Sequence, residues 1–162
     1  MPIDLVFRQV PVDVGDGAKL VTAMAAEMRE LYWDVGGGLD LDAPDMPKAG
    51  PAELGPPGGT FLVGYERGVD RAVCAGGLKR LPDGACEIKR MYVVPDARGH
   101  GVARVLLHAL EDAARELGYL VARLDTGHRQ GHAQRMYEAE GYRAIANFNG
   151  NPVATFFGEK QL

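Results

Sequence analysis

The sequence predicts an α+β fold, in which one early helix precedes a run of strands and the chain then alternates between helix and strand. Two stretches, 16–34 and 102–117, carry apolar residues at helical spacing. Between them, short turn-forming segments separate three strand-like runs, which is typical of an antiparallel meander. The 162 residues contain no internal repeat or composition boundary, so we expect residues 1–162 to form a single domain.

The first third of the chain is predicted to hold an edge strand, a helix and a long loop. Residues 3–10 are typical of an edge strand, and 16–34 follows a helical period behind a candidate N-cap, Asp16. The apolar positions of this helix are Leu20, Met24, Met28 and Leu31. Residues 35–59 are crowded with glycine and proline, so we expect a loop or short-helix region, and ordered loops of this length are often functional.

The middle of the chain is predicted to fold as three antiparallel strands. The strand-like runs are 60–66, 71–80 and 85–94. If residues 81–84 turn a hairpin about their centre, Cys74 faces a position near residue 91 rather than Cys86. We therefore expect both cysteines to be buried and reduced, as in a cytosolic protein, and not to form a disulfide.

The last third is predicted to alternate between helix and strand. A helix begins near residue 102 and ends at Gly118, because glycine is favoured just past a helix C-terminus. Its expected buried face contains Val102, Val105, Leu106, Ala109, Leu110, Ala113 and Leu117. The other expected elements are a strand at 119–126, a helix at 132–140 stopped by Gly141, and strands at 142–148 and 153–159.

Charge and composition exclude several classes of partner. The formal net charge of −4 argues against a protein that binds nucleic acid, because such proteins cluster lysine and arginine. The N-terminus lacks a basic start followed by an apolar run, so no secretory signal is expected. No apolar stretch approaches the roughly 20 residues that span a bilayer. The predicted location is cytoplasmic, with no membrane partner.

A glycine-rich turn before the helix at residue 102 predicts an anion site. The first N–H groups of a helix are unpaired and carry partial positive charge. Gly99 and Gly101 let the backbone approach a phosphate or pyrophosphate closely, and Arg98 and Arg104 add charge. A P-loop motif is absent, and a dinucleotide fingerprint fails because Arg104 stands where its third glycine belongs. With these two motifs excluded, the sequence predicts a phosphate site of a different strand–turn–helix type.

The residues of this turn resemble the acetyl-CoA signature of the GNAT superfamily of N-acetyltransferases. The matching positions are Val93, Pro95, Arg98, Gly99, Gly101 and Ala103. Residues 87–93 and 124–142 also resemble the fourth strand of that family and its fifth strand with the following helix. The resemblance covers residues 60–148 and, with the early helix, extends over the whole chain. It implies a mixed, mostly antiparallel central sheet with helices on both faces and a splayed central strand pair.

The resemblance also implies a binding site for acetyl-CoA. The backbone of Met91, Tyr92 and Val93 would bind the pantetheine amides and polarise the thioester carbonyl. Gln130 stands where many relatives have an asparagine that bonds pantetheine. The pyrophosphate would be wrapped by Arg98, Gly99, His100, Gly101, Val102, Ala103 and Arg104. The alternative for the glycines is a tight turn without a ligand.

Two catalytic residues follow from the resemblance. Tyr137 matches the usual general acid, and a phenol with a pKa near 10 stays protonated at neutral pH and can donate to the departing thiolate. Its alternative role is packing on the sheet beside Ala133 and Met136. Glu87 matches a position where relatives often place a base, acting directly or through a water; a solvated strand-edge carboxylate is the alternative, and Asp125 is a weaker rival.

The resemblance implies direct acetyl transfer to an amine within a ternary complex, without a metal. His128 and His132 have the i, i+4 spacing of zinc ligands, but the glutamate of a HExxH motif is missing. A non-catalytic CoA-binding regulatory module is the alternative function. The expected partner is a small-molecule or peptide amine, and a homodimer is compatible with these features.

The acceptor site is predicted from the charge of the segment after the first helix. Its acidic residues are Asp34, Asp40, Asp42, Asp45 and Glu53, against Lys48 alone. Tyr32 and Trp33 add aromatic faces that could contact a cation. A pocket walled by this segment would favour small cationic amines over acceptors with a free carboxylate. A solvated acidic loop is the alternative.

Overall fold

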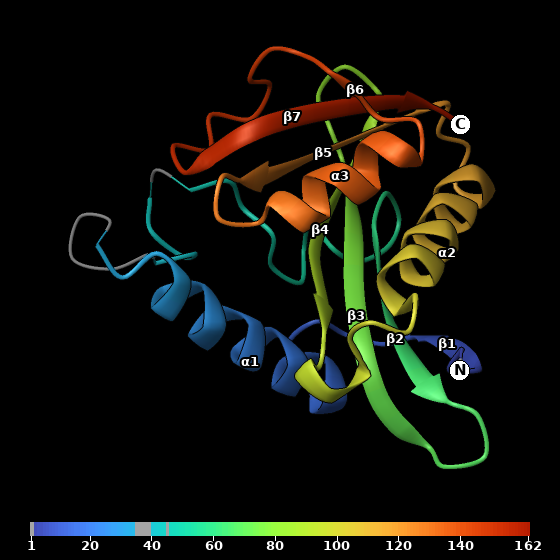
Figure 1. Cartoon of the computed structure of the whole chain (residues 1–162). Coiled ribbons are helices and arrows are strands. Elements are labelled where there is room, and N and C mark those ends of the chain that lie inside the picture. The colour runs from blue at the N-terminus through green and yellow to red at the C-terminus, as the bar shows by residue number, and fades with distance from the viewer. Residues whose placement is uncertain (1, 35–39, 45) are drawn as a thin grey trace.

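The protein forms a seven-stranded sheet covered by helices on both faces, in a computed structural model that describes residues 2–34, 40–44 and 46–162 (Figure 1). The strands are β1 (Leu5–Gln9), β2 (Thr60–Glu66), β3 (Arg71–Arg80), β4 (Cys86–Val93), β5 (Val121–Gly127), β6 (Arg143–Ala144) and β7 (Ala154–Gln161). The helices are α1 (Gly15–Leu31), α2 (Val102–Glu116) and α3 (Gly131–Ala139), with the short 3-10 helix η1 (Pro95–Ala97). The order of elements along the chain confirms the α+β prediction.

The sheet is mixed and mostly antiparallel, with the strand order β1-β2-β3-β4-β5-β7-β6. Only the central pair, β4 and β5, is parallel among the strands of the described residues. These two strands pair at Cys86↔Ala122 and Glu87↔Arg123 and then diverge (Figure 1). The backbone of Ile88 to Val93 therefore lacks a β5 partner. The splayed central pair that the sequence predicted is confirmed.

A β-bulge interrupts β4 beside this splay. Gly77 pairs with Lys89 and Ala75 pairs with Tyr92, so Gly76 faces both Arg90 and Met91. Arg90 has a φ of 60°, in the left-handed region that a residue with a Cβ occupies at a cost of about 1–2 kcal/mol. The extra residue breaks the alternation of side chains along the strand.

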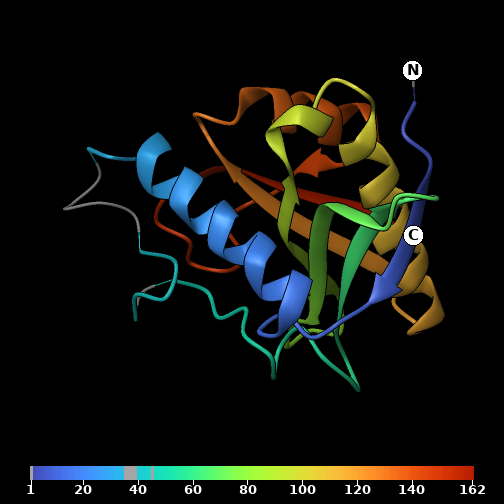
Figure 2. The same cartoon turned by 90° about the horizontal axis from the view of Figure 1, so that it is seen from below.

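Two apolar clusters hold the helices on opposite faces of the sheet. The larger one packs α2 and α3 on one face, and the smaller packs α1 on the other. Figure 2 shows these helices on opposite sides of the sheet. The buried side chains of α2 are Val102, Leu106, Leu107, Leu110, Glu111 and Ala114. Val105 and Leu117 are 44% and 39% exposed, so their predicted place on the buried face is wrong. The buried face of α2 is rotated about the helix axis relative to the predicted face, since Leu107 and Glu111 are buried instead.

The two cysteines agree with the sequence prediction, whereas the start of α1 differs from it. Cys74 and Cys86 are both free and buried, as predicted. Asp16 is not the N-cap of α1: the cap is Val14, and the Asp16 carboxylate accepts a hydrogen bond of 2.8 Å from the hydroxyl of Tyr65. No helix in the described part of the chain is both long and apolar enough to cross a membrane.

The strand expected at 142–148 is much shorter in the structure. β6 contains Arg143 and Ala144 alone. Beyond β6, an asparagine side chain forms hydrogen bonds with the backbone. The Oδ1 atom of Asn147 accepts hydrogen bonds from the N–H groups of Asn149 and Gly150. These local bonds offer the backbone an alternative to a strand ladder, so the segment turns instead of pairing.

Candidate active site

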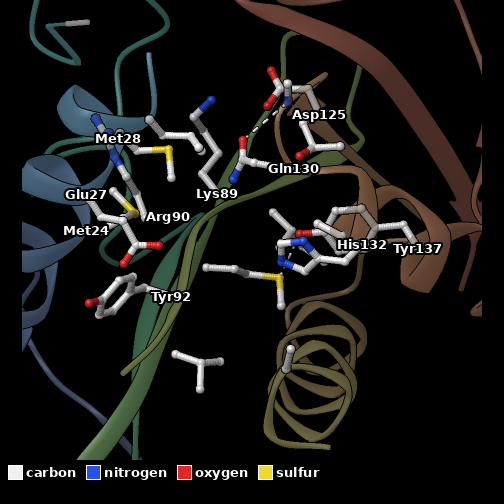
Figure 3. Close-up of a pocket in the computed structure, with 18 of the residues that line it drawn as sticks. Met24, Glu27, Met28, Lys89, Arg90, Tyr92, Asp125, Gln130, His132 and Tyr137 are labelled. Carbon is white, nitrogen blue, oxygen red and sulfur yellow. Dashed lines mark hydrogen bonds between the residues drawn. The ribbon is translucent and has the colours of Figure 1, made fainter. Parts of the chain in front are cut away.

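A cavity of about 620 Å³ lies where β4 and β5 diverge. α1 borders it on one side of β4, and the start of α2 and α3 border it on the other (Figure 3). Within the figure, Met24, Met28 and Arg90 lie on the α1 side, and His132 and Tyr137 lie across the strand. The cavity thus joins two differently built ends, which we call the α2 end and the α1 end.

The α2 end has the shape of a phosphate cradle. Gly99 and Gly101 have φ values of 81° and 76°, and α2 begins directly after them at Val102. A Cβ atom added at either glycine would meet no other atom within 4 Å, so the space before the helix is open. Unpaired N–H groups at the start of a 15-residue helix favour an anion there.

Most of the residues predicted to bind acetyl-CoA come together around this cavity. Those that line it are Met91, Tyr92, Val93, Arg98, Gly99, Gly101, Val102, Ala103, Arg104 and Gln130. His100, which was also predicted, is not among its lining residues.

The two arginines of the turn already have protein partners. Arg98 donates from Nε to the carbonyl of Val93 at 2.9 Å and from Nη2 to Glu27 of α1 at 2.7 Å. Arg104 forms an ion pair of 2.6 Å between its Nε and Glu140. Their charges are therefore partly compensated, and the N–H groups at the start of α2 supply the donors towards an anion.

Tyr137 reaches the cavity from α3. Its side chain is buried, belongs to the core cluster and also lines the cavity. The hydroxyl donates to the Sδ atom of Met91 at 3.6 Å. Burial raises the pKa of Tyr137 above its usual value, so the phenol keeps its proton at neutral pH. The packing and acid roles are thus geometrically compatible.

Gln130 is fixed by contacts between α1 and the end of β5. Its Oε1 accepts hydrogen bonds from the hydroxyl of Tyr32 at 3.4 Å and from the N–H of Gly127 at 3.3 Å. A Cβ at Gly127 would lie 1.8 Å from the Tyr32 hydroxyl oxygen, so only glycine permits this approach. The amide nitrogen of Gln130 has no hydrogen-bond acceptor among the residues that the structure describes, so it can donate to a ligand.

Glu87 belongs to a buried charge network rather than to the cavity wall. It is 0% exposed, so its alternative as a solvated strand-edge carboxylate is wrong. Its Oε2 lies 3.2 Å from Nζ of Lys89 and accepts from Asn149 at 2.7 Å. The same Asn149 nitrogen donates to Asp125 at 2.6 Å, and Asp125 does line the cavity. The role of Glu87 as base stays a prediction.

The acidic segment does not wall the cavity as expected. Asp34 forms a bidentate pair with Arg129, and neither Asp40, Asp42 nor Glu53 lines the cavity. The segment instead contributes Leu41, Met46 and Pro47. Asp45 lies outside the described residues. Tyr32 lines the cavity, but Trp33 is 75% exposed and does not. The charge argument for cationic amines therefore loses its structural basis.

Sequence reasoning missed three charged residues of the α1 end: Glu27, Lys89 and Arg90. The last two left a partial signal. Lys89 and Arg90 are adjacent basic residues that break the alternation of residues 86–89, which is compatible with a bulge, but three apolar residues follow and the pattern alone does not place one. No cluster of three or more metal-ligating side chains occurs within residues 2–34, 40–44 and 46–162, and His128 packs edge-on against Tyr32.

Comparisons with known proteins point to one family. The sequence profile described as "Acetyltransferase (GNAT) family" matches residues 17–142. An uncharacterised N-acetyltransferase of Schizosaccharomyces pombe is 28% identical over 146 residues, which cover 90% of this chain and 85% of that protein.

Solved structures show the same fold. A structure assigned as an acyl-CoA N-acyltransferase from Klebsiella pneumoniae is 25% identical, with a TM-score of 0.73 over 98% of this chain and 97% of that one. A GNAT family acetyltransferase from Elizabethkingia anophelis, solved with acetyl-CoA bound, is 13% identical, with a TM-score of 0.66 and 98% of both chains covered. The latter likeness concerns the fold alone.

Proposed function

Because the chain belongs to the acetyltransferase (GNAT) family, we propose that it transfers the acetyl group of acetyl-CoA directly to an amine within a ternary complex. The observation that carries this proposal is the continuity of the cavity. It connects the glycine turn before α2 with the gap between β4 and β5 and with the hydroxyl of Tyr137. Two ligands can therefore meet between the strands.

The residues at the α2 end fit acetyl-CoA. The open backbone at Gly99 and Gly101 would hold the pyrophosphate, and the unpaired edge of β4 beyond Glu87 would hold the amides of the pantetheine arm. Gln130 would donate to the same arm. When bound, acetyl-CoA supplies an acetyl group activated as a thioester.

Backbone and side chain share the chemistry at the reacting centre. A backbone N–H of Met91 to Val93 aimed at the thioester oxygen would stabilise the negative charge that develops there, an effect worth a few kcal/mol. The C–N bond forms as the C–S bond breaks, and Tyr137 would donate its hydroxyl proton to the leaving sulfur. The amine loses one proton, for which Asp125 at the cavity wall, coupled to Glu87 through Asn149, would be the acceptor.

The cysteines support direct transfer. An acetyl-enzyme route through cysteine requires a thiolate at the cavity, yet Cys74 and Cys86 do not line it. Burial raises the pKa of each thiol to about 12, so neither is a thiolate at neutral pH. A cysteine-linked acetyl-enzyme is thus disfavoured, and the proposed ternary complex makes the amine the nucleophile.

A thiol-release assay tests this function. Purified protein, acetyl-CoA and a broad panel of amines are mixed, and free CoA is measured with and without each amine. Amine-dependent release that falls steeply in Tyr137→Phe supports the proposal. Tight binding of CoA without release for any amine would favour the regulatory module instead.

A further inference from the structure

The charged side chains around the cavity are almost all paired within the protein. The ion pairs are Glu27–Arg98, Lys89–Glu87 and Arg104–Glu140, and the Asp125 carboxylate accepts hydrogen bonds from the amides of Asn149 and Asn151. Arg90 is the exception among the lining residues that the structure describes. Its Nε is buried without a hydrogen-bond partner, and its guanidinium forms no ion pair in the described part of the chain.

The bulge in β4 places Arg90 at the α1 end of the cavity. Figure 3 shows its side chain beside Met24 and Met28 of α1, across β4 from Tyr137 and His132. The glycine turn for the pyrophosphate belongs to the α2 end, so Arg90 lies on the side left for the acceptor. The bulge requires a left-handed backbone at this residue, with a φ of 60°.

An unpartnered guanidinium in a low-dielectric site favours a bound anion. Burial lowers the pKa of Arg90, which means that its charge is poorly solvated there. Asp42 and Asp125 act on it through space, but neither forms an ion pair with it. A carboxylate can accept two parallel N–H bonds from a guanidinium, which is the strongest pairing available to this group.

We propose that Arg90 binds the carboxylate of the acceptor, so that the substrate is an amine which also carries a carboxylate. The remainder of the acceptor is apolar, because the surrounding wall contains Met24, Met28, Leu31, Leu41, Met46 and Pro47. Apolar amino acids have this combination of groups. This inference rests on the proposed function and replaces the expected preference for cationic amines.

Matched acids and amides test the inference by kinetics. Leucine, methionine and phenylalanine are compared with their carboxamides as acceptors at saturating acetyl-CoA. In the wild-type protein, kcat/KM for the acids exceeds that for the amides by about tenfold or more, the scale of a charge-assisted hydrogen bond. In Arg90→Gln the ratio falls to about one, and Arg90→Lys retains part of it because the charge stays but the planar fork is lost.

A binding measurement separates this inference from the proposed function. Calorimetry with free CoA present measures the affinity of the same acids and amides, and it needs no turnover. If no amine is acetylated but the acids still bind more tightly than the amides through Arg90, the proposed function fails and the inference stands. Arg29→Gln, at an exposed position of α1, is the matched control for a general change of charge.

Three results would overturn the assignment. The first is equal binding of acids and amides by the wild-type protein, or binding of neither. The second is an acid preference that survives in folded Arg90→Gln. The third is a loss of acetyl-CoA affinity in Arg90→Gln with an unchanged acid-to-amide ratio, which would make Arg90 a contact of the cofactor.

Discussion

The two ends of the cavity are built by different means. The α2 end consists of backbone from one continuous turn, Arg98 to Arg104, whose glycines adopt left-handed φ values. The α1 end consists of side chains from α1, from the bulge in β4 and from the segment near Leu41. A backbone site depends on local sequence, whereas a side-chain site depends on tertiary packing. The first can therefore be recognised from a motif and the second cannot.

The largest expected effect concerns Tyr137, which stands where the two ends meet. Tyr137→Phe removes the proposed proton donor but keeps the buried ring, so kcat should fall by about 10²-fold while the affinity for CoA stays nearly constant. Steady-state kinetics and calorimetry with CoA measure the two quantities. Wild-type turnover in a folded variant would assign Tyr137 to packing alone.

The next effect tests the backbone site alone. Gly101→Val places a β-branched side chain at a φ of 76° and fills the open space before α2. The affinity for CoA should fall by at least about tenfold, or roughly 1.4 kcal/mol. Calorimetry measures it, and circular dichroism checks the fold. Unchanged affinity would contradict the phosphate cradle.

A smaller effect is expected from loosening the α1 end. Arg129 holds Asp34 with bonds of 2.5 and 2.9 Å and also donates to the carbonyl of Leu31. Asp34→Asn weakens this link between the end of α1 and the start of α3, so KM for the acceptor should rise by about threefold. The affinity for CoA should not change. An equal loss at both ends would mean that they are not independent.

The last prediction is that kcat does not change at alkaline pH. Burial raises the pKa of Tyr137 above the usual 10, so the acid stays protonated as the pH rises from 8 to 10. We expect no decline of kcat over this range at saturating acceptor. A fall with a midpoint near pH 10 would indicate a solvated phenol.

The predictability of the fold follows the same division. The bounds of the three strands of the meander could be predicted almost to the residue. Turn-forming residues separate these strands, and each strand pairs with its neighbour in sequence. The buried stripe of α2 was predicted with the wrong rotation, because Glu111 is buried by a partner distant in sequence: its carboxylate accepts from Tyr142 and Lys160. Such pairing is invisible to a hydrophobic pattern. The single-domain organisation over residues 1–162 stays a prediction.

The residues of the site also fall into two groups, those that a motif reveals and those that only the fold reveals. The glycine turn and Tyr137 were found through short motifs and do line the cavity. Glu87 was found by position in a strand, but only the fold reveals that Lys79, Lys89 and Asn149 enclose it. Arg90 was missed because its importance arises from a bulge, and a bulge depends on the register with β3.

The divergence of β4 from β5 also sets how rapidly amide protons exchange with solvent. Strand edges normally lie at the border of a sheet, but here part of the central strand, Ile88 to Val93, has an edge inside the molecule. Amides on that edge lack a partner and should exchange on the timescale of local fluctuations. The paired amides of β3 should exchange more slowly, because their exchange requires larger unfolding events. A ligand that lies along β4 would slow exchange there selectively, which gives a footprint of its extended arm at single-residue resolution.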